Sequence, residues 1–73
     1  MILNSKILRT VWTFVETSNP NNLLKLSDRE IVQQLIQQVE SVLVLSLEDN
    51  YHLSQYIASR TVLIRDLADS KVV

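Results

Sequence analysis

The stretch LSDREIVQQLIQQVE, from Leu26 to Glu40, decides the fold class because it is the clearest helix in the chain. Ser27 and Glu30 match the S-x-x-E capping box, in which the serine caps the glutamate amide and the glutamate reaches back. Apolar residues then recur with the spacing of one helical face, opposite the glutamines and Glu40. The face consists of Ile31, Val32, Leu35, Ile36, Val39, Val42 and Leu43. This pattern predicts a helix over about residues 28–43.

Two more helices are predicted, one on each side of this stretch. Residues 3–17 carry an apolar stripe that precedes the turn-forming segment 18–22. Ser46 starts a second capping pattern with two acids in its first turn, and an apolar stripe continues to about residue 68. We therefore expect an all-α fold over residues 1–73: a small three-helix domain with helices at about 3–17, 28–43 and 47–68.

The segment between the last two predicted helices is apolar and very short. Only Val44 and Leu45 remain as a connection, which predicts a C-terminal antiparallel helical hairpin. A short strand over residues 42–47 is an alternative, because valine favours extended backbone. No partner strand is evident in the sequence.

Composition excludes several kinds of chemistry. The 73 residues contain no cysteine and no glycine, so disulfides, thiolate zinc sites and glycine-rich nucleotide loops are all excluded. With one histidine, His52, we expect no metal site and no cofactor. A net charge of −1 lacks the basic footprint of a nucleic-acid binder, and no apolar run is long enough for a membrane span. We expect a cytoplasmic protein that does not bind a membrane.

Apolar residues outnumber the positions that three modest helical stripes require. Ile7, Phe14, Val44, Leu45 and Val62 lie off the main faces, and surplus apolar surface on a small protein indicates an interaction site. We expect a homodimer, or binding to another protein, beside the corner between the last two helices. Arg60 interrupts the last stripe, and either its stem lies along apolar surface or it pairs with a carboxylate such as Glu40 at the dimer interface. The candidate interface residues are Val42, Val44, Leu45, Leu47, Phe14, Arg60 and Glu40.

Catalytic chemistry finds little support among the titratable residues. His52 lies one turn after Glu48, but a histidine on a helix surface is the stronger interpretation. Most acids stand at helix N-termini, and Asp69 is placed to pair with Arg65 at i, i+4. Trp12 and Tyr56 lie in apolar stripes, which favours core packing over base stacking. We therefore predict that the protein is not an enzyme.

A small DNA-associated regulator is the alternative function. LSDREIVQQL has the look of the first helix of a helix-turn-helix, and LEDNYHLSQYI would then be the recognition helix. That helix opens with two acids, which phosphates would repel. The alternative requires four cations on one face of the protein, namely Arg9, Lys25, Arg29 and Arg65.

Two segments, LSDREIVQQLIQQVE and LSQYIASRTVLIRDLA, resemble parts of short conserved hypothetical proteins of cyanobacteria. The resemblance covers roughly residues 24–69. It implies a small helical bacterial protein without an assigned activity, and it transfers no functional residue. The leading expectation from the sequence is a non-enzymatic interaction module that self-associates through apolar helix faces.

Overall fold

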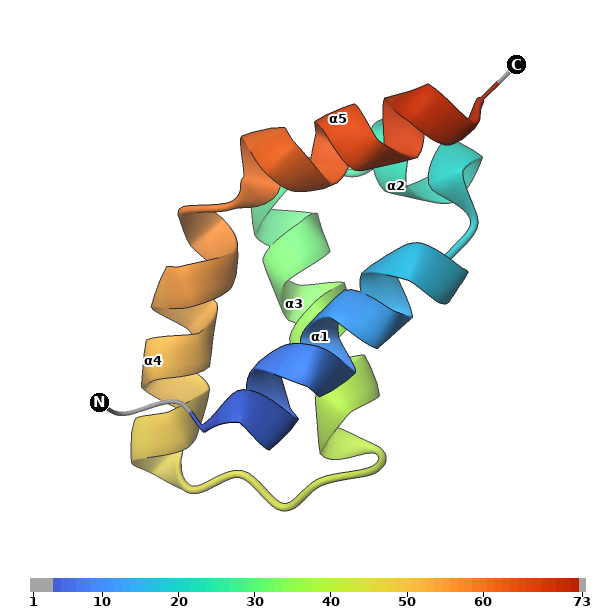
Figure 1. The fold of residues 1–73 in the computed structure, drawn as a ribbon. Coiled ribbons are helices and arrows are strands. Elements are labelled where there is room, and N and C mark those ends of the chain that lie inside the picture. Colours follow the sequence, from blue (N-terminus) through green and yellow to red (C-terminus); the bar gives the residue numbers. More distant parts are fainter. Residues whose placement is uncertain (1–3, 73) are drawn as a thin grey trace.

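The computed structural model describes residues 4–72, and every regular element within them is a helix. The helices are α1 (Ser5–Thr17), α2 (Pro20–Lys25), α3 (Asp28–Glu40), α4 (Leu47–Ala58) and α5 (Thr61–Lys71), as Figure 1 shows. The all-α expectation is confirmed. The expectation of three helices is wrong, because residues 4–72 form five. Residues 42–46 form a loop, so the strand alternative is wrong within the described chain.

The first two helices begin at asparagine caps. The Asn4 side chain accepts a hydrogen bond from the Ile7 amide at 2.8 Å, and the predicted start of α1 at Leu3 lies outside the described residues. Asn19 caps α2 by accepting from the Asn21 amide, and Pro20 follows with its φ already suited to a helix. The segment predicted only as a turn therefore leads into a short helix. That helix places Leu23 in the core.

The capping box predicted for α3 is present in full. The Glu30 amide donates to Ser27 Oγ, and the Ser27 amide donates to Glu30 Oε1 at 2.9 Å. The helix ends at Glu40 and not at residue 43, where Ser41 turns its hydroxyl back onto the Gln38 carbonyl. The connection to α4 is therefore the loop 41–46, longer than the two residues expected. Ser46 caps α4 through the Asp49 amide, as predicted.

The predicted single helix over 47–68 is wrong, because the chain bends at Ser59 and Arg60 and separates α4 from α5. The Ser59 hydroxyl donates to the Tyr56 carbonyl at 2.7 Å, which offers the backbone an alternative to helical bonding. A straight helix over 47–68 would be roughly 33 Å long. The bend instead buries Thr61, Ile64 and Ala68.

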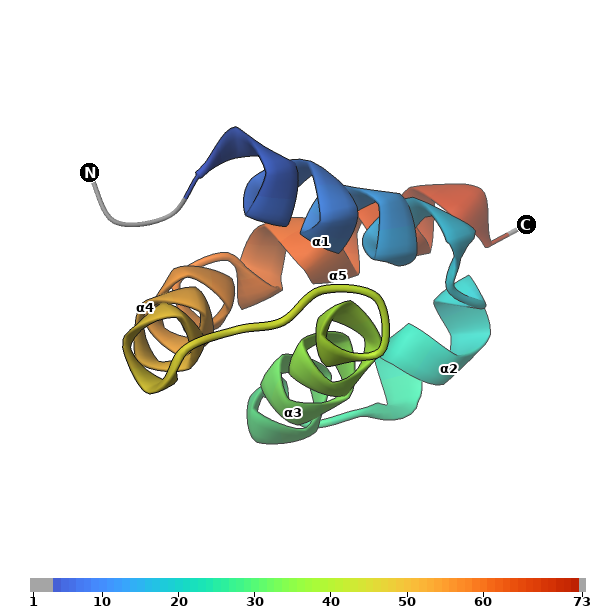
Figure 2. The same cartoon turned by 90° about the horizontal axis from the view of Figure 1, so that it is seen from below.

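The helices enclose one core in two layers. Figure 2 shows α3 and α4 side by side with α1 lying across them, while α5 runs past α2 at one end of the molecule. The buried apolar residues come from all five helices: Ile7, Val11, Val15, Leu23, Ile31, Leu35, Ile36, Val39, Leu53, Ile57, Ile64 and Ala68. Among the described helices, none lies over the side of α3 and α4 that faces away from α1.

Candidate interaction surface

The corner formed by loop 41–46 and the start of α4 exposes aliphatic side chains to solvent. Val44 is 100% exposed, Leu47 is 92% exposed and Val42 is 60% exposed. Leu45 differs from them, because it is half-buried and packs against the core. We name Val42, Val44 and Leu47 the apolar corner. Leaving three aliphatic side chains in water is costly for a small domain, at roughly 25 cal/mol per Å² of apolar surface that burial would remove from water.

Other apolar residues that the sequence placed off the main faces are partly or wholly inside the protein. Ile7 is a core residue, and Phe14 is half-buried against the core near the C-terminal end of α1. Val62, in contrast, is exposed on α5. Phe14 therefore contributes mainly to the fold. The surplus of apolar surface is smaller than the sequence indicated, and part of it is concentrated at the apolar corner.

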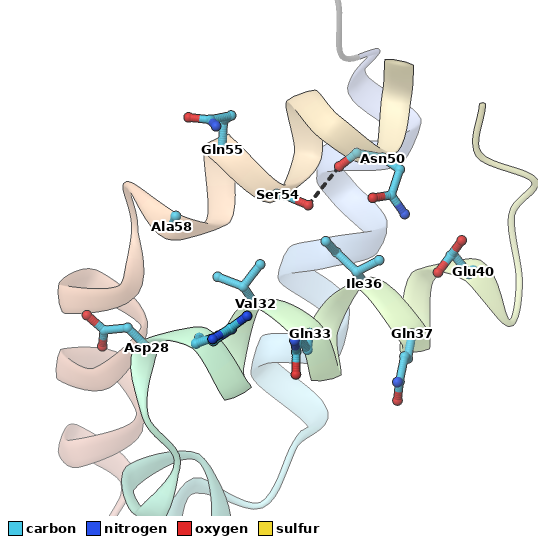
Figure 3. Close-up of a pocket in the computed structure, with 11 residues that line it drawn as sticks. Asp28, Val32, Gln33, Ile36, Gln37, Glu40, Asn50, Ser54, Gln55 and Ala58 are labelled. Atoms are coloured by element: carbon cyan, nitrogen blue, oxygen red, sulfur yellow. Dashed lines mark hydrogen bonds between the residues drawn. The ribbon is translucent and has the colours of Figure 1, made fainter. Parts of the chain in front are cut away.

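Arg60 and Glu40 are not brought together within one chain. Arg60 follows the C-terminal end of α4, where its Cζ lies 4.8 Å from the centroid of the Tyr56 ring and its Nη1 donates to Ser59 Oγ. Glu40 is the exposed last residue of α3, next to the loop that leads to Leu47. Figure 3 shows Glu40 and Ala58 at opposite ends of the α3–α4 pair. The Arg60 guanidinium is thus occupied with Tyr56.

A groove of about 720 Å³ runs between α3 and α4 on the side that faces away from α1. Its apolar lining comes from Val32, Ile36 and Ala58. Four amide side chains also line it, namely Gln33, Gln37, Asn50 and Gln55. We name this hollow the α3–α4 groove.

The two ends of the α3–α4 groove carry opposite charges. Arg29 lines the groove from the first turn of α3, next in sequence to Asp28. Glu40 lines it at the last residue of α3, and Figure 3 shows Asp28 and Glu40 at opposite ends. Sequence reasoning missed the groove because it depends on how two helices are rotated against each other. One signal was present, since Arg29 and Glu40 are eleven positions apart and therefore share a helical face.

Trp12 and Tyr56, both predicted to be packing residues, contact each other between α1 and α4. Their rings meet edge to face with centroids 6.4 Å apart, and Trp12 Nε1 donates to the Tyr56 hydroxyl at 3.0 Å. Both side chains are half-buried against the core. Their aromatic surfaces thus support the fold.

Arg65 does not pair with Asp69, contrary to expectation. Its Nε and Nη2 donate to Asp28 Oδ1 at 3.1 and 2.8 Å, and Nη2 also donates to the Leu26 carbonyl. This contact fastens α5 to the start of α3. One of the four cations that the DNA-associated alternative requires is therefore committed to the fold.

The one histidine of the chain, His52, contacts an acidic side chain of its own helix. His52 Nε2 lies 3.8 Å from Glu48 Oε1, one turn away on α4. Within the described residues, no group of three or more histidine, cysteine or acidic side chains is arranged to hold a metal ion. None of the described helices combines the length and the apolar character needed to cross a membrane.

Comparison with known proteins adds no assignment. No protein-family model matches the chain, and no curated protein or solved structure shows significant similarity to it. The resemblance of residues 24–69 to short cyanobacterial proteins stays a prediction.

Proposed function

We propose that the protein is a non-enzymatic interaction module that self-associates as a homodimer through the apolar corner. The observation that carries the proposal is the exposure of Val44 and Leu47, at 100% and 92%. A loop valine and a leucine at the first position of a helix have no structural need to be apolar. Burial against a second copy would give both side chains a role.

The position of the apolar corner also suits association. It lies at one end of the molecule, beside the uncovered side of α3 and α4, so a partner can approach it without displacing a helix. The polar residues around it, Glu40 and the glutamines of α3, are suited to an interface rim. Apolar area would drive association, and the polar rim would select the partner.

The test is the molar mass in solution, measured by size exclusion with light scattering over a hundredfold dilution. We expect a mass near twice 8.4 kDa at high concentration. Val44→Glu and Leu47→Glu should shift the protein to the monomer without lowering its melting temperature. Val62→Glu is the matched control, because Val62 is an exposed valine on α5 and should tolerate the charge. Leu45 is a poor choice for this test, because its half-buried side chain supports the core.

Two results would contradict the proposal. One is a wild-type protein that stays monomeric over the whole concentration range. The other is a dimer that survives Val44→Glu and Leu47→Glu as well as it survives Val62→Glu.

A further inference from the structure

Two charges on α3 stand where the helix itself disfavours them. Arg29 is in the first turn, where the helix dipole repels a cation, and Glu40 is the last residue, where the dipole repels an anion. Among the described residues, neither side chain takes part in an ion pair or a side-chain hydrogen bond. Neither charge therefore stabilises α3.

Arg29 and Glu40 are arranged so that they complement a reversed copy of themselves. They lie three helical turns apart, about 16 Å, at the two ends of the α3–α4 groove. Rotation of a second copy by 180° about an axis that crosses α3 at its middle reverses the direction of that helix. Each Arg29 then faces Glu40 of the second copy, and two ion pairs form across the interface.

The sizes of the side chains along the outer face of α4 are complementary under the same rotation. Leu47, Tyr51, Ser54 and Ala58 recur at i, i+4, i+7 and i+11, which places them on one face. The two large side chains occupy the first half of the helix and the two small ones the second half. Reversal places Leu47 against Ala58 and Tyr51 against Ser54 of the second copy. Each large side chain thus meets a small one.

We propose that a second copy of this chain binds the uncovered face of α3 and α4 in an antiparallel arrangement, with Arg29 of each copy paired to Glu40 of the other. This inference rests on the proposed self-association, and of the apolar corner it places Leu47 in the interface. The face is two helices wide and roughly 20 Å square, smaller than the interface of a stable dimer. The dimer is therefore weak, with a dissociation constant on the order of 10 µM.

Charge reversal tests the arrangement in the intact protein. Arg29→Glu and Glu40→Arg each replace two attractions by two repulsions, so each should raise the dissociation constant roughly tenfold. The double variant restores opposite charges and should dimerise like wild type. Both changes suit the dipole of α3, so the variants should fold at least as well as wild type. Matched controls on the exposed surface of α1 are Arg9→Glu and Glu16→Arg, which should leave the affinity unchanged.

A disulfide test reports the direction of packing. The natural chain has no cysteine, so introduced thiols are unique. A mixture of Leu47→Cys and Ala58→Cys proteins should form a cross-linked heterodimer under mild oxidation. Leu47→Cys alone should cross-link poorly, because its thiols lie at opposite ends of the dimer.

The possible failures are distinguishable. One outcome is a dimer that dissociates with Val44→Glu but keeps its affinity after the charge reversals. Another is a dimer in which Leu47→Cys cross-links to itself. Either result would overturn the antiparallel arrangement and keep the proposed function. A double variant that is weaker than either single variant would do the same. A monomeric wild type would overturn both proposals.

Discussion

The indole of Trp12 donates a hydrogen bond from Nε1 to the hydroxyl of Tyr56, at 3.0 Å, and so joins α1 to α4 across 44 positions of sequence. The Arg60 guanidinium lies over the same Tyr56 ring, with its Cζ 4.8 Å from the ring centroid. One tyrosine thereby connects the first helix, the fourth helix and the turn that leads to α5. The contact adds a polar link to the apolar packing of α1 on the core.

Replacement of Tyr56 by phenylalanine tests the hydrogen bond alone. The ring packing is kept, but Trp12 Nε1 loses its acceptor in a half-buried place. We expect the free energy of unfolding to fall by about 1 kcal/mol. Urea denaturation followed by circular dichroism measures this change. Tyr51→Phe is the control, because Tyr51 is exposed and should respond by less than about 0.5 kcal/mol. Equal effects of the two substitutions would contradict a role for the bond.

Truncation of Leu53 tests the core. Leu53 is fully buried, so Leu53→Ala should cost about 2–5 kcal/mol of unfolding free energy. The total free energy of unfolding of so small a domain is little larger than this loss, so the variant should be largely unfolded at 37 °C. Leu67→Ala is the control, since Leu67 lies partly in solvent on α5. Thermal melts of the two variants should therefore differ widely. A cooperative melt of Leu53→Ala near the wild-type temperature would show that the site is not part of a packed core.

Acid stability depends on the capping box of α3. The Ser27 amide and hydroxyl hold the pKa of Glu30 below its ordinary value of 4.5. Because the folded pKa is the lower one, this contribution is present above the unfolded value and is lost as the pH falls through the folded value. A carboxyl titration followed by NMR should place the Glu30 pKa below 4.5. Ser27→Ala should move it back toward 4.5. A Glu30 pKa at or above 4.5 in the wild type would contradict the linkage.

Loss of Arg65 should cost more than loss of its carboxylate partner. Arg65→Ala removes the bonds to both Asp28 and the Leu26 carbonyl, whereas Asp28→Ala removes only the ion pair. Both side chains are partly in solvent, so a double-mutant cycle should give a coupling of less than about 1 kcal/mol, weakened by high salt. Chemical denaturation of the four proteins at two salt concentrations measures it. An Asp28→Ala variant as unstable as Arg65→Ala would contradict the role of the Leu26 carbonyl.

The sequence was sufficient to predict the helix caps and the buried face of α3, because these features depend on residues close together in the chain. Ser27 and Ser46 are caps in the structure, as their neighbours predicted, because a capping bond spans only three residues. The buried face of α3 also agrees with its apolar spacing at Ile31, Leu35 and Val39. These features need no knowledge of the rest of the chain.

The features that the sequence did not predict depend on contacts between distant elements. The bend at Ser59 and Arg60 is favoured because it returns α5 to the core, which residues 59–60 alone do not indicate. Helix α2 has a recognisable start at Asn19 and Pro20, but it is short and its one buried anchor, Leu23, packs in a core made by other helices. The α3–α4 groove likewise depends on the rotation of two helices against each other.

The contact between α2 and α5 also determines when the fold can form during synthesis. Helix α2 makes its main helix–helix contacts with α5, which is synthesised after α3 and α4. A nascent chain that ends at the bend has made α2 but not the helix that covers it. Leu23 therefore lacks its cover until α5 has been synthesised, and the five-helix fold cannot form before that point. A premature stop after α4 would release a product with an open core, a natural substrate for cellular proteases.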